Sequence, residues 1–250
     1  MNTKTASKHS RRTFLKASGT AAAALAVGAL PFAAHAATGS AAKTRIGIVG
    51  SGRIGSALGG IWAKAGHEVM FSSLDLEHDK KLAASLGPNA SAGTSREAVA
   101  FGDVILMAVP YRALPQLSKD LADVIKGKVV IDATNPIVAR DGEVAVAARE
   151  KGAGLASAEY LPGARIVRAF NAVGAARLPE ISQRQGERPG MPIASDDAKA
   201  VEVASRLIRD VGFEPVLIGP LAMGKHLIPG TPLAGERTPA EIRKIVPTLS

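Results

Sequence analysis

Runs of apolar residues alternate along the chain with segments in which apolar residues recur every three or four positions. Buried parallel strands produce the first pattern, and amphipathic helices that cover a sheet produce the second. Strands are predicted at residues 44–49, 69–71, 104–109, 128–132, 164–170, 191–194 and 215–218. Helices are predicted at residues 54–65, 82–86, 96–100, 114–125 and 197–211, with a short one near the C-terminus. This alternation predicts an α/β fold, a doubly wound and mostly parallel Rossmann-type sheet in a single domain.

A glycine-rich segment lies between the first predicted strand and the first predicted helix. It reads Gly50-Ser51-Gly52-Arg53-Ile54-Gly55. A G-x-G-x-x-G pattern is weak evidence alone, but a strand before it and a helix after it are the context in which it binds a dinucleotide. The first glycine permits the tight turn, the second lets the pyrophosphate approach the backbone, and the third lets the helix pack close to the sheet. The segment predicts a dinucleotide site at a helix N-terminus, where free N–H groups face the phosphates.

The end of the second predicted strand decides between NAD and NADP. NAD-specific proteins place an acidic residue there, about 20 residues after the glycine loop, to bind the ribose 2′-hydroxyl. The corresponding position here is Ser73, preceded by Ser72, and a hydroxyl does not repel a 2′-phosphate as a carboxylate does. Lys80 or Lys81 can add positive charge, whereas Asp75 argues the other way. The sequence favours NADP(H) over NAD(H).

The first 36 residues predict an export signal rather than a membrane-anchoring helix. Arg11 and Arg12 precede a soft apolar stretch at 21–34, and Ala34-His35-Ala36 offers small residues at the two positions that a signal peptidase reads. This order is typical of a secretory signal, and the paired arginines resemble a twin-arginine leader. The stretch is too short and too weakly apolar for a stable membrane span of roughly 20 residues.

Three segments are therefore expected. They are a removed twin-arginine signal peptide at 1–36, a flexible lead-in at 37–43, and an NADP-binding domain with a short C-terminal extension at 44–250. The product is expected in the periplasm or otherwise exported, after engaging the twin-arginine machinery. Because that pathway carries folded proteins, we expect the nucleotide to be bound before export and to be held tightly.

Composition narrows the classes of partner. The formal charge of +9 is concentrated in the leader, and removing residues 1–36 leaves 26 basic against 22 acidic residues. No basic run with interleaved aromatic residues remains, so no nucleic-acid partner is expected. The chain has no cysteine, which excludes disulfides, thiolate catalysis and Cys-ligated metals. No histidine or carboxylate spacing favours a metal site either.

Several segments together resemble the coenzyme F420-dependent NADP oxidoreductase family, which is related to the N-terminal domains of metalloreductases and of pyrroline-5-carboxylate reductases. They read GIVGSGRIGSAL at 47–58, AGHEV at 65–69, AVPY at 108–111, IDATNP at 131–136, VRAFNAVG at 167–174 and GPL at 219–221. The likeness covers most of residues 44–221. It implies hydride exchange between NADP(H) and F420, another flavin-like molecule or another small acceptor, and a tendency to form homodimers.

The resemblance also implies roles for individual positions. Ser51, Arg53 and Ile54 are implied to line the pyrophosphate, and Ser73 to approach the 2′-phosphate. The residues implied beside the ribose or adenosine and beside the nicotinamide are Val109, Pro110, Asn135, Pro136, Asn171 and Ala172. The chain departs from the family at Leu74, where an arginine is usual, and at 223–230, which does not match an F420 pocket.

Hydride transfer proceeds largely through alignment of two rings, so catalysis needs no acid–base pair. His226 is the candidate proton donor, Asp132 is expected to cap the loop that follows it, and His67 is expected at the surface. Asn135 and Asn171 follow apolar strands at the edge where ligands bind in this fold. Two alternatives stay open: a non-catalytic NADP(H)-binding sensor or partner subunit, and a reductase of a small imine or carbonyl.

Overall fold

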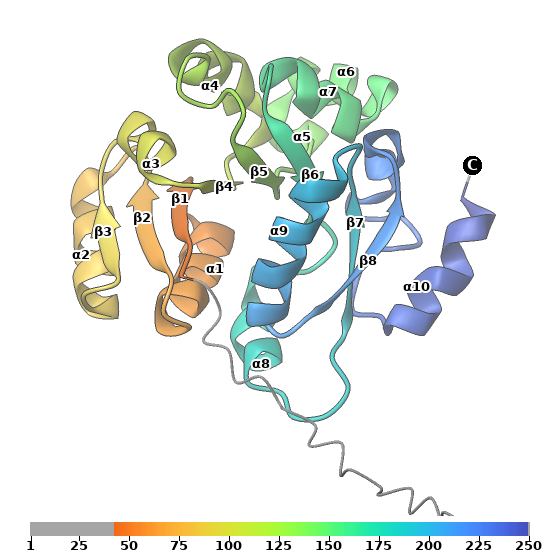
Figure 1. Cartoon of the computed structure of the whole chain (residues 1–250). Coiled ribbons are helices and arrows are strands. Elements are labelled where there is room, and N and C mark those ends of the chain that lie inside the picture. Colours follow the sequence, from red (N-terminus) through yellow and green to blue (C-terminus); the bar gives the residue numbers. More distant parts are fainter. Residues whose placement is uncertain (1–42, 250) are drawn as a thin grey trace, which may run out of the picture. The chain divides into compact units, whose positions relative to one another are not determined.

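The computed structural model describes residues 43–249, so the signal peptide expected at 1–36 and nearly all of the lead-in at 37–43 lie outside the described residues. Within them the chain forms an eight-stranded sheet with the order β3-β2-β1-β4-β5-β6-β7-β8 (Figure 1). The strands are β1 (Arg45–Val49), β2 (Glu68–Ser72), β3 (Ala90–Ala92), β4 (Val104–Met107), β5 (Val129–Asp132), β6 (Arg165–Arg168), β7 (Gly190–Ala194) and β8 (Glu214–Gly219). Strands β1 to β6 are parallel, whereas β7 and β8 run antiparallel to them.

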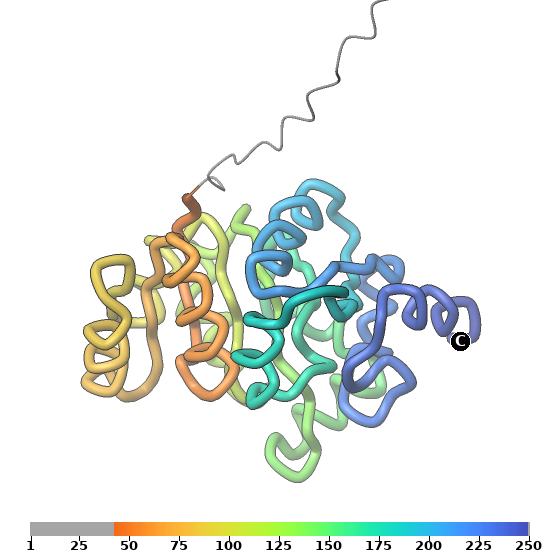
Figure 2. Tube along the Cα trace, turned by 90° about the horizontal axis from the view of Figure 1, so that it is seen from below, coloured from red at the N-terminus to blue at the C-terminus, as the bar shows by residue number. Residues whose placement is uncertain are grey.

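Helices connect the strands and cover both faces of the sheet. They are α1 (Arg53–Lys64), α2 (Leu76–Leu86), α3 (Ser95–Phe101), α4 (Leu114–Leu121), α5 (Val138–Asp141), α6 (Glu143–Lys151), α7 (Ala153–Tyr160), α8 (Leu178–Ser182), α9 (Ala198–Asp210) and α10 (Pro239–Ile245). Short 3-10 turns lie at Tyr111–Ala113, Ala175–Arg177, Leu221–His226 and Val246–Thr248. Figures 1 and 2 show α2 at one end of the sheet and α10 at the other.

Successive strand residues feed two different cores, as the pleat of a strand requires. Ile46 and Ile48 of β1 pack with Trp62 of α1, whereas Val49 packs with Tyr111 on the opposite face. Helices α1 and α9 cover the first face, where the Trp62 indole donates to the Leu207 carbonyl at 2.9 Å. Helices α3, α4, α6 and α7 cover the second face. A sheet buried on both sides explains why its strands read as continuous apolar runs.

The predicted α/β class, the mostly parallel doubly wound sheet and all seven predicted strands are confirmed. Strand β3 and the helices between β5 and β7 were not predicted. The three residues of β3 are Ala-Ser-Ala, too short and too weakly apolar for the pattern to register. Helices α6 and α7 are rich in alanine and are separated by Gly152, whose φ of 93° breaks one helix into two. Their alanines give little contrast between a buried and an exposed face.

The expectation that His67 lies at the surface is wrong. Its side chain is 3% exposed, and its Nδ1 accepts the Thr44 N–H at 3.2 Å. Its Nε2 lies 3.0 Å from the carboxylate of Asp210, the last residue of α9. The imidazole therefore joins the start of β1 to the end of a helix that is distant in sequence.

No helix within residues 43–249 is both long and apolar enough to cross a membrane.

Candidate functional site

The glycine loop follows β1 at the point where the order of strands reverses. β2 and β3 lie on one side of β1, and β4 and the later strands lie on the other. Gly50 comes directly after β1 and Ala108 directly after β4, and the Ala108 N–H donates to the Val49 carbonyl at 2.8 Å. Ligands of open α/β sheets bind beyond the carboxyl ends of the strands at such a reversal. The topology alone therefore locates the candidate site.

Each of the three glycines of the loop is required, or tolerated, for a different steric reason. Gly50 has a φ of 100°, and a Cβ added there would lie 2.5 Å from the Ala108 carbonyl oxygen. A Cβ on Gly55 would lie 2.0 Å from the Gly50 oxygen, so this position lets α1 pack against the loop. A Cβ on Gly52 meets nothing within 4 Å. Gly52 therefore borders open space rather than protein.

That open space lies at the N-terminus of α1. Gly52 is the N-cap, no side chain caps the helix, and its first turn contains no acidic residue. Arg53 follows directly, with an exposed side chain. Unpaired N–H groups and the positive end of the helix dipole attract phosphate oxygens. The loop is therefore a cradle for a phosphate group that approaches the backbone at Gly52.

Two hollows meet at this cradle and share Gly52, Ala108, Val109 and Pro110. The larger hollow has a volume of about 740 Å³ and the smaller about 530 Å³. Besides the shared residues, the larger is lined by Arg53, Ile54, Ser56, Ala133, Asn135, Ile137, Arg140, Val173, Gly174, Ala175 and Ala176. The smaller is lined by Val49, Gly50, Ser51, Ser73, Leu74, Asp75, Ser95, Arg112, Ala113, Gln116, Leu117 and Asp120. Such a pair suits the two halves of a dinucleotide joined over the glycine loop.

A buried polar network supports the wall of the larger hollow. Asp132 accepts hydrogen bonds from the backbone N–H and the hydroxyl of Thr134, at 2.9 and 2.6 Å, so it caps the loop as predicted. Arg168 donates to the other Asp132 oxygen at 2.6 Å and to the Thr134 carbonyl at 2.9 Å. The Asn171 amide nitrogen donates to the same carbonyl at 2.8 Å. These buried hydrogen bonds tie the loop after β5 to β6, although Arg168 Nε and Asn171 Oδ1 have no partner.

Asn135 is the member of this region that reaches the hollow. Its amide nitrogen donates to the Asn171 carbonyl at 3.0 Å, which fixes the orientation of the side chain. Its Oδ1 is buried and has no hydrogen-bond partner. A buried acceptor without a partner costs free energy unless a ligand or water satisfies it. The oxygen is therefore available to a ligand that offers N–H groups.

Arg140 borders the same hollow and is held rigidly. Its guanidinium donates to both oxygens of Asp141, at 2.9 and 2.8 Å, and to the Asn135 carbonyl at 2.8 Å. Burial tends to raise the pKa of Asp141, but the hydrogen bonds from Arg140 and from the Ile137 amide hold that pKa below its ordinary value. The ion pair fixes a positive charge beside the cleft.

The smaller hollow ends at a corner built from β2 and α2. Ser73 is at this corner, and its hydroxyl donates to Asp79 Oδ2 at 2.8 Å. The Ser51 hydroxyl donates to the other oxygen of Asp79, which is fully buried. The side chain of Leu74 is fully exposed to solvent. Asp75 caps α2, because its carboxylate accepts the His78 N–H at 2.9 Å. Asp79 was not among the predicted site residues, because its place in a lysine-flanked helical turn is typical of a surface residue.

The predicted site residues divide into three groups. Those that line the two hollows are Gly50, Ser51, Gly52, Arg53, Ile54, Ser73, Val109, Pro110 and Asn135. Gly55 and Asn171 support the walls from behind. Pro136, Ala172 and the candidate proton donor His226 line neither hollow.

Ser72 needs a correction, because it is fully buried and its hydroxyl donates to the Ile48 carbonyl at 2.7 Å. That bond joins β2 to β1 and leaves no donor for a ligand. Of the two lysines offered as a source of charge beside Ser73, Lys80 pairs with Glu77 at 2.8 Å, and neither Lys80 nor Lys81 lines the smaller hollow. The residues at 173–176 were missed, although they directly follow the predicted Asn171 and Ala172.

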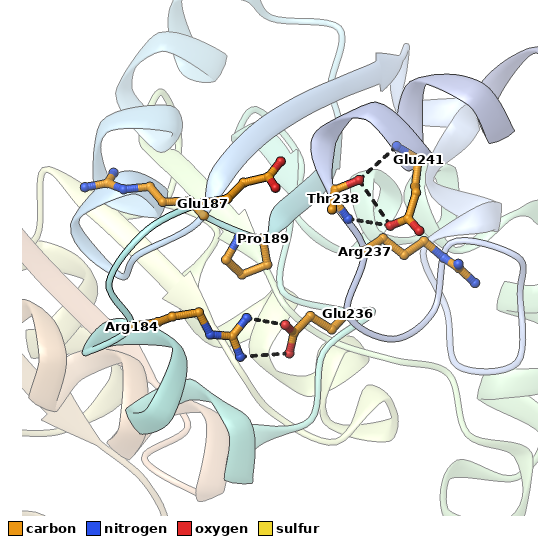
Figure 3. Close-up of a pocket in the computed structure, with 8 residues that line it drawn as sticks. Arg184, Glu187, Pro189, Glu236, Arg237, Thr238 and Glu241 are labelled. Carbon is orange, nitrogen blue, oxygen red and sulfur yellow. Dashed lines mark hydrogen bonds and ion pairs between the residues drawn. The ribbon is translucent and has the colours of Figure 1, made fainter.

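A third hollow, of about 230 Å³, lies apart from this cleft between the loop before β7 and the N-terminus of α10 (Figure 3). Charged residues line it, and Glu236 binds the guanidinium groups of Arg184 and Arg177. The hydrogen bonds from Arg184 and Arg177 lower the pKa of Glu236 to about 2. The charged residues of this hollow therefore join two loops through ion pairs. Within residues 43–249, no cluster of His, Asp or Glu is arranged to hold a metal ion.

Comparison with known proteins agrees with this geometry. The family model described as NADP oxidoreductase coenzyme F420-dependent matches residues 45–136, a span that includes the glycine loop, β4 and Asn135. An F420-dependent NADP reductase of Methanothermobacter thermautotrophicus is 31% identical over 199 residues, which cover 74% of this chain and 85% of that protein. The chain belongs to the F420-dependent NADP reductase family. It is therefore a member of a family of NADP-dependent oxidoreductases.

Two further relatives place this family member among wider neighbours. Metalloreductase STEAP3 of Rattus norvegicus is 30% identical over 188 residues, covering 73% of this chain and 35% of that protein. A crystal structure of a hypothetical protein of Sinorhizobium meliloti is 26% identical with a TM-score of 0.66, covering 78% of this chain and 95% of the other. A model of twin-arginine translocation signal sequences matches residues 8–28, in agreement with the leader predicted from the sequence.

Proposed function

We propose that this reductase-family member transfers a hydride between NADP(H), bound across the two hollows, and a flavin-like or other small acceptor. The observation that carries the proposal is the open space above Gly52, at an uncapped helix N-terminus where two hollows meet. A helix N-terminus with room for a close approach is suited to the pyrophosphate of a dinucleotide. Family membership supports NADP(H) as the nucleotide.

The chain's own residues would hold the cofactor in two places. The N–H groups at the start of α1 and the side chain of Arg53 face the pyrophosphate. The amide of the nicotinamide would donate to Asn135, which lines the larger hollow and whose Oδ1 has no partner in the protein. When bound, the nicotinamide supplies the carbon that gives or takes the hydride. The contribution of the protein is alignment, which Asn135 provides because the buried network behind it does not move.

The acceptor would enter the larger hollow. Its walls include the apolar side chains of Ile54, Ile137 and Val173, with Arg140 at the border. Apolar walls exclude water and suit a planar conjugated ring. We include export by the twin-arginine route in the proposal, with the nucleotide bound before the protein leaves the cytoplasm. The signal-sequence match at residues 8–28 supports this order.

The test compares two glycine-to-alanine variants of α1. Gly52→Ala adds a methyl group in the open cradle, whereas Gly60→Ala adds one that makes only an ordinary 3.5 Å contact with Leu86. Gly52→Ala is expected to weaken NADPH binding about tenfold, a loss of about 1.4 kcal/mol, because the phosphate can no longer approach the backbone. Gly60→Ala is expected to bind as the wild type does, measured by quenching of tryptophan fluorescence or by calorimetry.

Activity is measured with F420, a free flavin and a ferric chelate as acceptors. Oxidation of NADPH by any of these acceptors, with a kcat/KM for NADPH that is lowered in Gly52→Ala and kept in Gly60→Ala, supports the proposed enzyme. Binding of NADPH without transfer to any acceptor would leave a nucleotide-binding sensor or partner subunit instead. If both variants bound NADPH as tightly as the wild type does, the proposed binding site at Gly52 would be wrong.

A further inference from the structure

The ribose corner of the smaller hollow has a hydrogen-bonding pattern that the family resemblance does not imply. The carboxylate of Asp79 is fully buried and lies behind the end of β2. Its two oxygens accept hydrogen bonds from two serines, Ser51 of the glycine loop and Ser73 after β2. Both serines line the hollow. One carboxylate therefore holds the protons of two of the three serine hydroxyls that line this hollow, the third being that of Ser95.

The Ser73 hydroxyl has few hydrogen-bonding positions left for a ligand. A hydroxyl has one proton and two lone pairs. The Ser73 proton is directed to Asp79 at 2.8 Å, and one lone pair accepts the Asp75 N–H at 3.1 Å. What remains is one lone pair, which accepts a hydrogen bond and donates none. The Ser51 proton is likewise directed to Asp79.

A 2′-phosphate and a 2′-hydroxyl make opposite demands on such a corner. The phosphate is an anion that only accepts hydrogen bonds at neutral pH, so it needs donors or positive charge. The hydroxyl of NAD(H) can donate to the free lone pair of Ser73. The Ser51 and Ser73 hydroxyls in this arrangement suit the 2′-hydroxyl better than the 2′-phosphate.

The charges around the corner act in the same direction. Asp75 and Asp79 both carry carboxylates there, and Leu74 occupies the position after Ser73 with a fully exposed apolar side chain. Among the described residues that line this hollow, the cation is Arg112. Its guanidinium donates to the Arg140 carbonyl at 2.8 Å and lies 3.5 Å from the Asp141 carboxylate, so it is engaged on the side of the larger hollow.

We infer that Asp79 is a specificity-determining residue for the nucleotide, because it turns Ser51 and Ser73 into a corner that accepts a ribose 2′-hydroxyl. The protein then uses NAD(H) as a second cofactor, with an affinity comparable to that for NADP(H). The inference rests on the proposed function, in which the two hollows bind a nicotinamide dinucleotide.

Three variants and two nucleotides test the inference. Asp79→Asn keeps the shape of the side chain, removes one negative charge and frees one serine proton for a ligand. Glu77→Gln removes the same charge from the same helix, but Glu77 pairs with Lys80 at 2.8 Å and lines neither hollow, so it is the matched control. Leu74→Arg adds a cation at a fully exposed position, where no packing is disturbed. The dissociation constants of NADH and NADPH are measured for each folded protein.

The wild type is expected to bind NADH and NADPH within about tenfold of each other. Asp79→Asn should shift the ratio about fivefold to tenfold toward NADPH, and Leu74→Arg should tighten NADPH by a similar factor with NADH unchanged. Glu77→Gln should leave the ratio within about twofold, because solvent screens an exposed charge.

Two results would overturn the inference. One is a wild type that binds NADPH more than about a hundredfold tighter than NADH. The other is a ratio that moves no further in Asp79→Asn than in Glu77→Gln, or, if Asp79→Asn does not fold, a Leu74→Arg variant with unchanged NADPH affinity. Failure of the proposed function looks different, because the wild type would then bind neither nucleotide.

Discussion

Arg168 of β6 donates to the carboxylate of Asp132 at the end of β5, with 2.6 Å between Nη1 and Oδ2, and both side chains are completely buried. The pair belongs to the network that fixes the loop carrying Asn135. Asp132→Asn leaves the buried guanidinium without a counter-charge, which is expected to lower the free energy of unfolding by about 3–5 kcal/mol. Denaturation in urea measures the loss.

The matched comparison for that pair is an ion pair at the surface. Arg96 and Asp123 are both more than half exposed, so Arg96→Ala should change the unfolding free energy by less than about 1 kcal/mol. A loss in Asp132→Asn no larger than that in Arg96→Ala would mean that the buried pair does not hold the fold together.

Substitution by alanine is expected to affect activity at Asn135 and stability at Asn171. Asn135→Ala removes an unpaired oxygen from a residue that lines the larger hollow and is expected to lower kcat/KM about tenfold or more, with little loss of stability. Asn171→Ala removes buried bonds to two backbone carbonyls and is expected to lower stability by about 1–3 kcal/mol. Steady-state kinetics and urea denaturation on the same preparations separate the two roles; the assignment is lost if Asn135→Ala keeps full activity.

Stability should fall in acid where Glu236 becomes protonated. Its pKa in the folded protein is about 2 because Arg184 and Arg177 donate to it, which is below the value of about 4.3 expected in the unfolded chain. A lowered carboxyl pKa stabilises the fold above the unfolded value, and this contribution is lost as the pH falls from about 4.3 toward 2. Unfolding free energies between pH 5 and 2 for the wild type and for Glu236→Gln measure it. The variant should lose less stability over this range, and identical profiles would contradict the assignment.

The exported protein should carry its nucleotide. If NADP(H) is bound before passage through the twin-arginine route, the folded protein recovered outside the cytoplasm releases about one equivalent of nucleotide on acid extraction. Mass spectrometry of the supernatant identifies NADP or NAD and so also reports on the ribose corner. Material without nucleotide that also fails to bind added NADPH would contradict both the export order and the site.

Sequence patterns predicted the sheet well because a sheet buried on both faces leaves long apolar runs such as 104–109. They also predicted the glycine loop, because the need for glycine there is local. A side chain at Gly50 or Gly55 would clash with backbone atoms of the loop itself or of the residue that follows the adjacent strand. Family resemblance added Val109, Pro110 and Asn135, which line the cleft.

What escaped prediction depends on contacts between distant segments. Asp79 meets Ser51 across 28 positions, and His67 meets Asp210 across 143 positions. No periodicity in the sequence carries such pairings. Ser72 was placed in the site because it adjoins Ser73, yet consecutive strand residues point to opposite faces, and its hydroxyl serves β1. The alanine-rich helices α6 and α7 were invisible because their buried and exposed positions are chemically alike.

The C-terminal segment has a bearing on the cleft that its distance in sequence conceals. The Gly235 N–H donates to the Ala172 carbonyl at 2.8 Å, and Glu236 grips Arg177, so this segment braces the loop that supplies one wall of the larger hollow. None of the residues of this segment lines the larger hollow, so a proteolytic cut near Gly235 is expected to loosen that wall without removing any part of it.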